Sequence, residues 1–381
     1  DAQRYFDQGM VLAFGFNHAE SIRSFRAAQT LDPSCAMCFW GEALATGPNI
    51  NVTANGKAVM TEDEQVAAYA ALQKARELAP NANQTEQDLI GALATRYAPQ
   101  PVADRSELDR AYATALGDLV AKYPEDDDIA AMYAEAWMNT MPWDYWSDGE
   151  TPRPEAVGAI NALEDILARS PNHPLALHLY IHAVEASADP AQGEIAADLL
   201  RGSVPMAGHL VHMPAHIYNR IGRYADSIEV NKAAIAADEA YLAAANDRAS
   251  ALYRYGYYPH NIHFLLVGAQ MAGLKDEALA AAAKLAGVTS AEVSGDLAWV
   301  QAIDTAPFTA HAQFSDPNRI VALPDPGDTF PFVKGHWHYA RGTAFALKGD
   351  LDAAIAEQQA IERITADADL SGLEAQYLPA R

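Results

Sequence analysis

The sequence is poor in cysteine and contains no long apolar run. Its two cysteines are too few for a disulfide scaffold, and no stretch approaches the roughly 18 to 20 apolar residues that cross a bilayer. We therefore expect neither a disulfide-stapled domain nor a membrane span. The cysteines form one Cys35-x-x-Cys38 motif, for which a local disulfide, a reduced pair and a metal site all stay open.

Several signatures of catalysis are also absent. The chain has no glycine-rich phosphate loop, no dinucleotide fingerprint, no Gly-x-Ser-x-Gly elbow and no His-Glu-x-x-His run. Their absence argues against the common nucleotide-binding enzymes, the serine hydrolases with that elbow and the zinc proteases with that run.

Basic residues are scarce. The chain holds 26 Lys and Arg against 50 Asp and Glu, which gives a net charge of −24. Such a surface repels phosphate groups, so we expect no nucleic-acid partner and no adhesion to anionic membranes. The same charge favours solubility and the uptake of cations.

The first residue, Asp1, is not a methionine, and no basic and apolar leader precedes the first predicted helix. Two explanations stay open: a signal peptide has been removed, or the chain has been trimmed. The first predicts a periplasmic or secreted protein, and otherwise we expect a cytoplasmic one.

Helical features dominate what is present. Half of the residues are hydrophobic, alanine is abundant, and apolar residues recur at helical spacing, which predicts an all-α fold. Three segments align without gaps: 222–228, 273–279 and 349–355. In each, we expect the leading glycine to end a helix in the left-handed conformation and an acidic turn to open the next helix. This pattern predicts a repeated helical hairpin.

A second pattern marks the ends of helices in the N-terminal part. The segments Leu31-Asp32-Pro33 and Leu78-Ala79-Pro80 each close a predicted helix, and Tyr123-Pro124 and Ser170-Pro171 repeat that ending. Together with the glycine pattern, these segments resemble the tetratricopeptide repeat (TPR), a helix-turn-helix of about 34 residues. The resemblance implies a right-handed α-α superhelix whose first helices line a concave groove, where ligands bind.

On this resemblance we expect a single TPR-like solenoid over residues 1–381. Its predicted parts are N-terminal repeats at 1–140, a Trp-rich loop insertion at 141–155, central His-rich repeats at 156–290, and a C-terminal loop with a capping repeat at 291–381. The Trp-rich loop contains Trp143 and Trp146. Recognition of a ligand and simple anchoring of the loop are equally good interpretations of these tryptophans.

Histidines are concentrated in the central part. Eight of the twelve lie between residues 173 and 263, and residues three or four apart share one face of a helix. The resulting stripes are His178, His182 and Glu185; His209, His212 and His216; and His260 with His263.

The glycine pattern places these stripes on equivalent helices. His209, His260 and His336 each stand thirteen residues before a repeat glycine, and His212 and His263 stand ten before theirs. Equivalent positions in stacked repeats lie along one surface. Extending the frame towards the N-terminus adds Cys35, Cys38 and Glu42, so we expect the strong metal ligands of the chain to face one cavity.

Imidazole binds zinc, copper, iron and nickel, and thiolate binds zinc and copper(I). We therefore predict a zinc or copper site in the groove, for metal-dependent hydrolysis or metal handling, with Glu185 as general base or further ligand. Its predicted metal ligands are His178, His182, His209, His212, His216, His260 and His263. A second candidate site comprises Cys35, Cys38, Glu42 and His336, and Tyr258 and Asn261 are predicted to contact a small molecule or peptide.

Other interpretations stay open. A single histidine on an apolar helix face is more often a hydrogen-bonded core residue than a ligand, and we assign His18, His173 and His311 to that class. The chief alternative function is a non-enzymatic TPR adaptor that binds a peptide or protein in its groove. A third is a pH sensor, because clustered imidazoles repel one another once protonated.

Overall fold

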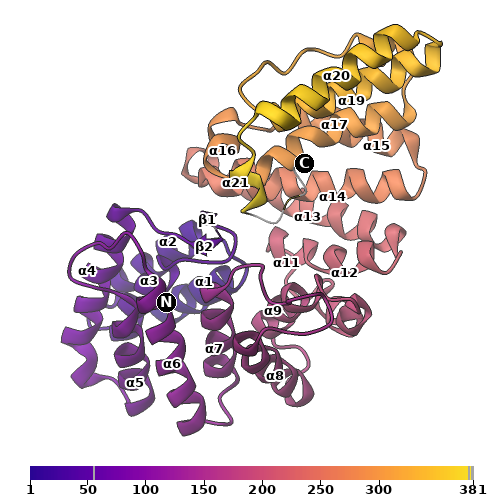
Figure 1. The fold of residues 1–381 in the computed structure, drawn as a ribbon. Coiled ribbons are helices and arrows are strands. Elements are labelled where there is room, and N and C mark those ends of the chain that lie inside the picture. Colours follow the sequence, from indigo (N-terminus) through magenta and orange to yellow (C-terminus); the bar gives the residue numbers. More distant parts are fainter. Residues whose placement is uncertain (55, 376–377, 379–381) are drawn as a thin grey trace. The chain divides into compact units, whose positions relative to one another are not determined.

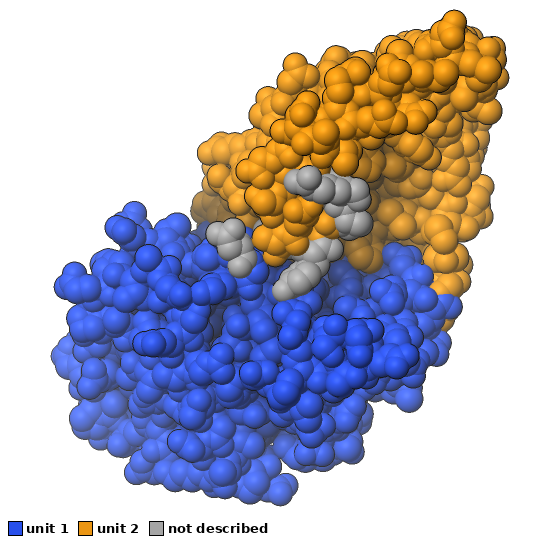
Figure 2. Space-filling view, in the orientation of Figure 1, with its two compact units in different colours: residues 1–221 blue, residues 222–381 orange. Residues whose placement is uncertain are grey.

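The computed structural model describes residues 1–54, 56–375 and 378, and it confirms the all-α, TPR-like fold of helical hairpins (Figure 1). The chain divides into two compact units, unit 1 at residues 1–221 and unit 2 at residues 222–381 (Figure 2). The boundary falls within the predicted central repeats at 156–290. A single solenoid through the whole chain stays a prediction, and each unit is described by itself.

Unit 1 consists of hairpins that pack on their neighbours in sequence, together with one short antiparallel strand pair. Its elements are α1 (Ala2–Phe14), α2 (His18–Leu31), α3 (Ala36–Ala45), β1 (Thr53–Ala54), β2 (Lys57–Ala58), α4 (Glu62–Leu78), η1 (Ala79–Asn81), α5 (Gln84–Leu93), η2 (Ala94–Arg96), α6 (Ser106–Lys122), α7 (Asp127–Thr140), α8 (Pro154–Arg169), α9 (Pro174–Val184), η3 (Pro190–Gly193), α10 (Glu194–Leu200), α11 (Gly208–His212) and α12 (Pro214–Arg220).

Unit 2 is also built of helical hairpins. Its elements are α13 (Tyr224–Ala245), η4 (Asn246–Arg248), the π-helical turn η5 (Tyr253–Tyr257), α14 (Tyr258–Met271), α15 (Lys275–Leu285), α16 (Ala291–Asp296), α17 (Val300–Phe314), α18 (Pro317–Val321), α19 (Pro331–Lys348), α20 (Leu351–Asp367) and α21 (Ser371–Glu374). Among the described residues, no helix is both long and apolar enough to cross a membrane.

The turn chemistry of the sequence explains where helices begin and end. Gly222, Gly273 and Gly349 all have the predicted left-handed backbone, with φ between 71° and 81°. At the start of α4, Thr61 and Glu64 form a reciprocal capping box, which satisfies backbone N–H groups that a helix start leaves unpaired. The predicted hairpins therefore form from local signals.

The beginning and the end of unit 1 meet. Helix α1 packs on α2 and α3, its neighbours in sequence, and also on α9. The backbone at Gly15, just after α1, lies close to Leu210 of α11, since a Cβ built there would be 3.4 Å from that side chain. This contact brings the end of α1 to the helices that carry the first two histidine stripes.

Close packing around Phe25 holds α1, α2 and α3 together. Phe25 is fully buried, a Cβ at Gly9 would lie 2.7 Å from its ring, and a Cβ at Gly41 would overlap it. We expect Gly41→Ala to lower the free energy of unfolding by about 1–3 kcal/mol through overpacking. Chemical denaturation followed by circular dichroism measures this change.

Gly91 in α5 provides the matched control, because an added Cβ there has no described atom within 4 Å. Gly91→Ala is expected to be neutral or to stabilise by about 0.5–1 kcal/mol, since alanine restricts the unfolded chain. Equal effects of the two substitutions would contradict the packing explanation.

Candidate metal site

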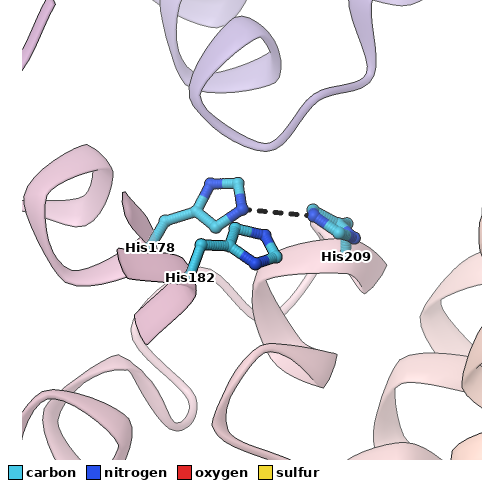
Figure 3. A group of neighbouring side chains, drawn as sticks. All are labelled: His178, His182 and His209. Carbon is cyan, nitrogen blue, oxygen red and sulfur yellow. Dashed lines mark hydrogen bonds between the residues drawn. The ribbon is translucent and has the colours of Figure 1, made fainter. Parts of the chain in front are cut away.

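Three buried imidazoles converge inside unit 1 (Figure 3). His178 and His182 project from α9, and His209 projects from α11. One ring nitrogen of each residue lies within 4.8 Å of the corresponding nitrogens of the other two. The Nε2 atoms of His178 and His209 are 3.2 Å apart. We call these three residues the histidine triad.

The end of α1 fixes the ring of His178. Its Nδ1 lies 2.7 Å from the backbone carbonyl oxygen of Phe14. A carbonyl only accepts hydrogen bonds, so Nδ1 carries the proton and donates it. The neutral ring then presents the lone pair of Nε2 towards His209, which is the form of imidazole that binds a metal.

Glu185, the residue after α9, orients two further rings. One carboxylate oxygen accepts from Nδ1 of His182 at 2.9 Å, and the other accepts from Nδ1 of His216 at 2.6 Å. Burial alone would raise the pKa of Glu185, but His216 and His182 lower that pKa well below its usual range. The ionised carboxylate therefore directs the Nε2 lone pairs of both histidines away from itself. Its predicted role as general base or ligand stays a prediction.

The lone pair of His182 has an unusual environment. Its Nε2 is buried and has no hydrogen-bond partner within the part of the chain that the structure describes. Burial lowers the pKa of both His178 and His182, and the neighbouring histidines lower it further. Both rings are thus neutral near pH 7, as metal ligands must be.

Two more histidines lie beside the triad. His212 ends α11, and His216 lies on α12. Their Nε2 atoms are 2.9 Å apart, and both side chains are buried. We call these two residues the histidine pair. The first two stripes predicted from the sequence are therefore brought together in unit 1.

The site is lined by two aromatic side chains that no sequence pattern assigned to it. The ring of Phe16 lies 4.5 Å from that of His178 and 5.6 Å from that of His209, between ring centroids. Trp143 meets His182 edge-on at 5.0 Å and donates its indole N–H to the carbonyl of Ile50. Both residues have positive φ, which no sequence pattern revealed. The Trp-rich loop is thus anchored in unit 1 and also packs on the site.

His18 lies on the other side of Phe16, with ring centroids 5.6 Å apart. Burial lowers the pKa of His18 from its usual 6.5 to about 4; a hydrogen bond to the carbonyl of Ala45 opposes the shift, and Arg96 adds to it. Because the pKa of His18 is lower in the folded protein than in the unfolded chain, the neutral ring contributes to stability above pH 6.5. This contribution is lost as the pH falls to 4.

We therefore expect the metal-free protein to lose stability on acidification between pH 6.5 and 4, and the His18→Gln variant to lose less. One such group contributes a slope of up to about 1.4 kcal/mol per pH unit. Urea denaturation at several pH values measures the slope. Identical slopes for both proteins would show that His18 is not the responsible group.

The remaining residues of the predicted site lie in unit 2. His260 and His263 are on α14, where the ring of Phe264 contacts both. Tyr258 donates to Glu239, and Asn261 donates to Asp238. These bonds join α14 to α13, so both polar groups have a structural role. That His260 and His263 belong to the metal site stays a prediction. Contact of Tyr258 and Asn261 with a substrate also stays a prediction.

The second candidate site does not assemble within either unit. Cys35 and Cys38 form a disulfide at the start of α3, which is one of the alternatives left open above and leaves no thiolate for a metal. Glu42 accepts hydrogen bonds from Arg26 and Gln29. His336 belongs to unit 2, where its Nδ1 donates to the carbonyl of Phe332.

The structure thus defines a helical-hairpin protein with a buried imidazole cluster. No protein-family model and no curated protein sequence matches the chain. Solved structures are similar at low identity. Human IFIT1 in a dimer with PPP-AAAA has 11% identity and a TM-score of 0.45, over 93% of this chain and 70% of that one. Yeast Tom70 has 11% identity and a TM-score of 0.29, over 99% and 88%. The TPR domain of P58(IPK) has 13% identity and a TM-score of 0.22, over 99% and 98%.

Proposed function

We propose that unit 1 binds a transition-metal ion, zinc or copper, at the histidine triad. The observation that carries this proposal is the buried Nε2 of His182, which has no partner among the described residues. A ring nitrogen of the same residue lies within 4.8 Å of ligand atoms of His178 and His209. A buried acceptor without a partner costs about 1–3 kcal/mol. A bound cation would remove that cost.

The surroundings of the triad support the same proposal. Metal-binding histidines usually donate their other ring N–H to a carbonyl or carboxylate, which fixes the ring and its tautomer. His178 does so to Phe14 and His182 does so to Glu185. Neutral nitrogen ligands suit zinc and copper better than calcium or magnesium. With three imidazoles, a tetrahedral ion keeps one position for water, so the site suits either metal handling or metal-dependent hydrolysis.

Metal analysis of the full chain tests the proposal. The metal-free protein is titrated with Zn²⁺, and separately with copper, in competition with a chromophoric chelator. We expect tight binding by the parent protein, and a loss of at least 10²-fold in affinity in the variant that combines His178→Ala with His182→Ala, because two ligands are removed.

His338→Ala is the matched control, since His338 is a histidine of unit 2 that bonds to Glu357. This variant should bind metal as the parent does. A triad variant that also binds like the parent, or a parent protein that binds no metal, would refute the proposal.

A second candidate function is peptide binding by a TPR-like adaptor. The observation that favours it is a set of apolar side chains on the hairpin of α19 and α20 that are each about half or more exposed: Tyr339, Leu347, Leu351 and Ile355. Large exposed apolar patches mark interaction surfaces. If the metal-free protein binds an apolar peptide at full strength and Leu347→Glu abolishes that binding, the adaptor function is supported.

A further inference from the structure

The two Nε2 atoms of the histidine pair face each other at hydrogen-bond distance, somewhat closer than two ligands of one ion. They are 2.9 Å apart. Two nitrogens bound to one tetrahedral zinc ion, each at about 2.1 Å, lie about 3.4 Å from each other. The Nε2 atoms of His178 and His209 in the triad, at 3.2 Å, are similarly placed.

Five imidazoles are more than one tetrahedral ion accepts, since such an ion takes four ligands. The five also converge on two points, because the Nε2 of His178 faces His209 while the Nε2 of His216 faces His212. The groups are nevertheless adjacent: the rings of His182 and His216 are 5.4 Å apart between centroids.

Glu185 links the two groups. It accepts the Nδ1 proton of His182 from the triad with one oxygen and that of His216 from the pair with the other. An ionised carboxylate only accepts hydrogen bonds, so each of these rings must present a lone pair at Nε2. One side chain therefore prepares one ligand in each group.

We propose that unit 1 holds two transition-metal ions, one at the triad and a second at the pair, with Glu185 orienting one ligand of each. This inference rests on the proposed function and specifies its stoichiometry. The second ion receives two imidazoles from unit 1, those of His212 on α11 and His216 on α12.

The test counts metal equivalents on the full chain. The metal-free protein is loaded with Zn²⁺, freed of excess ion by gel filtration and analysed for zinc. We expect two equivalents for the parent protein, one for His212→Ala combined with His216→Ala, and one for His178→Ala combined with His182→Ala. Titration with Co²⁺ adds a spectroscopic measurement, in which the parent should show two successive visible absorption components and each double variant one.

The outcomes separate this inference from the proposed function. One equivalent of zinc in the parent protein, or two in the pair variant, would contradict the proposal of a second ion without contradicting the triad site. No zinc in the parent overturns both. Circular dichroism verifies folding, and if the alanine variant of the pair unfolds, the His212→Gln, His216→Gln variant replaces it with the same expected loss of one equivalent.

Discussion

The Glu185→Ala variant is expected to bind zinc or copper about 10- to 100-fold more weakly than the parent protein at each group, the triad and the pair. Removing an orienting partner of a ligating histidine typically costs 10–100-fold in metal affinity, and Glu185 orients two such residues, His182 and His216. Without it, each ring can rotate or move its proton to Nε2. Competition with a chromophoric chelator measures the affinity.

The metal affinity of the Glu185→Gln variant should lie between that of the parent protein and that of the Glu185→Ala variant. The amide of glutamine keeps one accepting oxygen and offers a donor in place of the other, so it satisfies one Nδ1–H group and not both. Glu164→Gln is the control, because Glu164 is an exposed residue of the same unit that bonds to Tyr180. An affinity of the Glu185→Ala variant within twofold of the parent's would contradict the orienting role.

The Asp109→Ala variant is expected to lose about 3–5 kcal/mol of the free energy of unfolding of unit 1. Asp109 is buried in α6 between two buried guanidinium groups, at 3.1 Å from Arg105 and 3.8 Å from Arg96. Breaking a buried ion pair by removing one partner costs this much because the remaining charges stay desolvated and uncompensated. Chemical denaturation measures the change.

An exposed residue of the same helix tests whether burial is the cause. Asp118→Ala, at an exposed position of α6, is expected to change stability by less than about 0.5 kcal/mol. Because the chain has two compact units, the transition of unit 1 must be resolved from that of unit 2. A loss below 1 kcal/mol for Asp109→Ala would indicate that water reaches the two arginines.

The hairpins could be predicted from the sequence because their signals are local. A glycine such as Gly349 ends a helix by its own left-handed backbone, and helical periodicity identifies a buried face without any knowledge of distant residues. The histidine stripes on α9 and α11 were predictable for the same reason, since they depend only on spacing along each helix.

The rest of the site depends on contacts between distant segments. The carbonyl that fixes His178 belongs to Phe14, 164 residues away, and any residue type supplies a carbonyl. The bidentate role of Glu185 follows from the position of α12 relative to α9, which spacing along α9 does not contain. The Cys35–Cys38 disulfide was one of three alternatives because the motif alone does not report its redox state.

The contact between the end of α1 and α9 has a consequence for how quickly an ion could enter or leave. The carbonyl of Phe14 is the only described backbone acceptor for the ring of His178. Detachment of α1 alone would therefore break this hydrogen bond and expose Phe16. Partial opening of this kind requires less free energy than unfolding of the whole unit. The dissociation rate of the ion would then follow the stability of the first hairpin, and hydrogen exchange in residues 2–14 would slow when the ion is present.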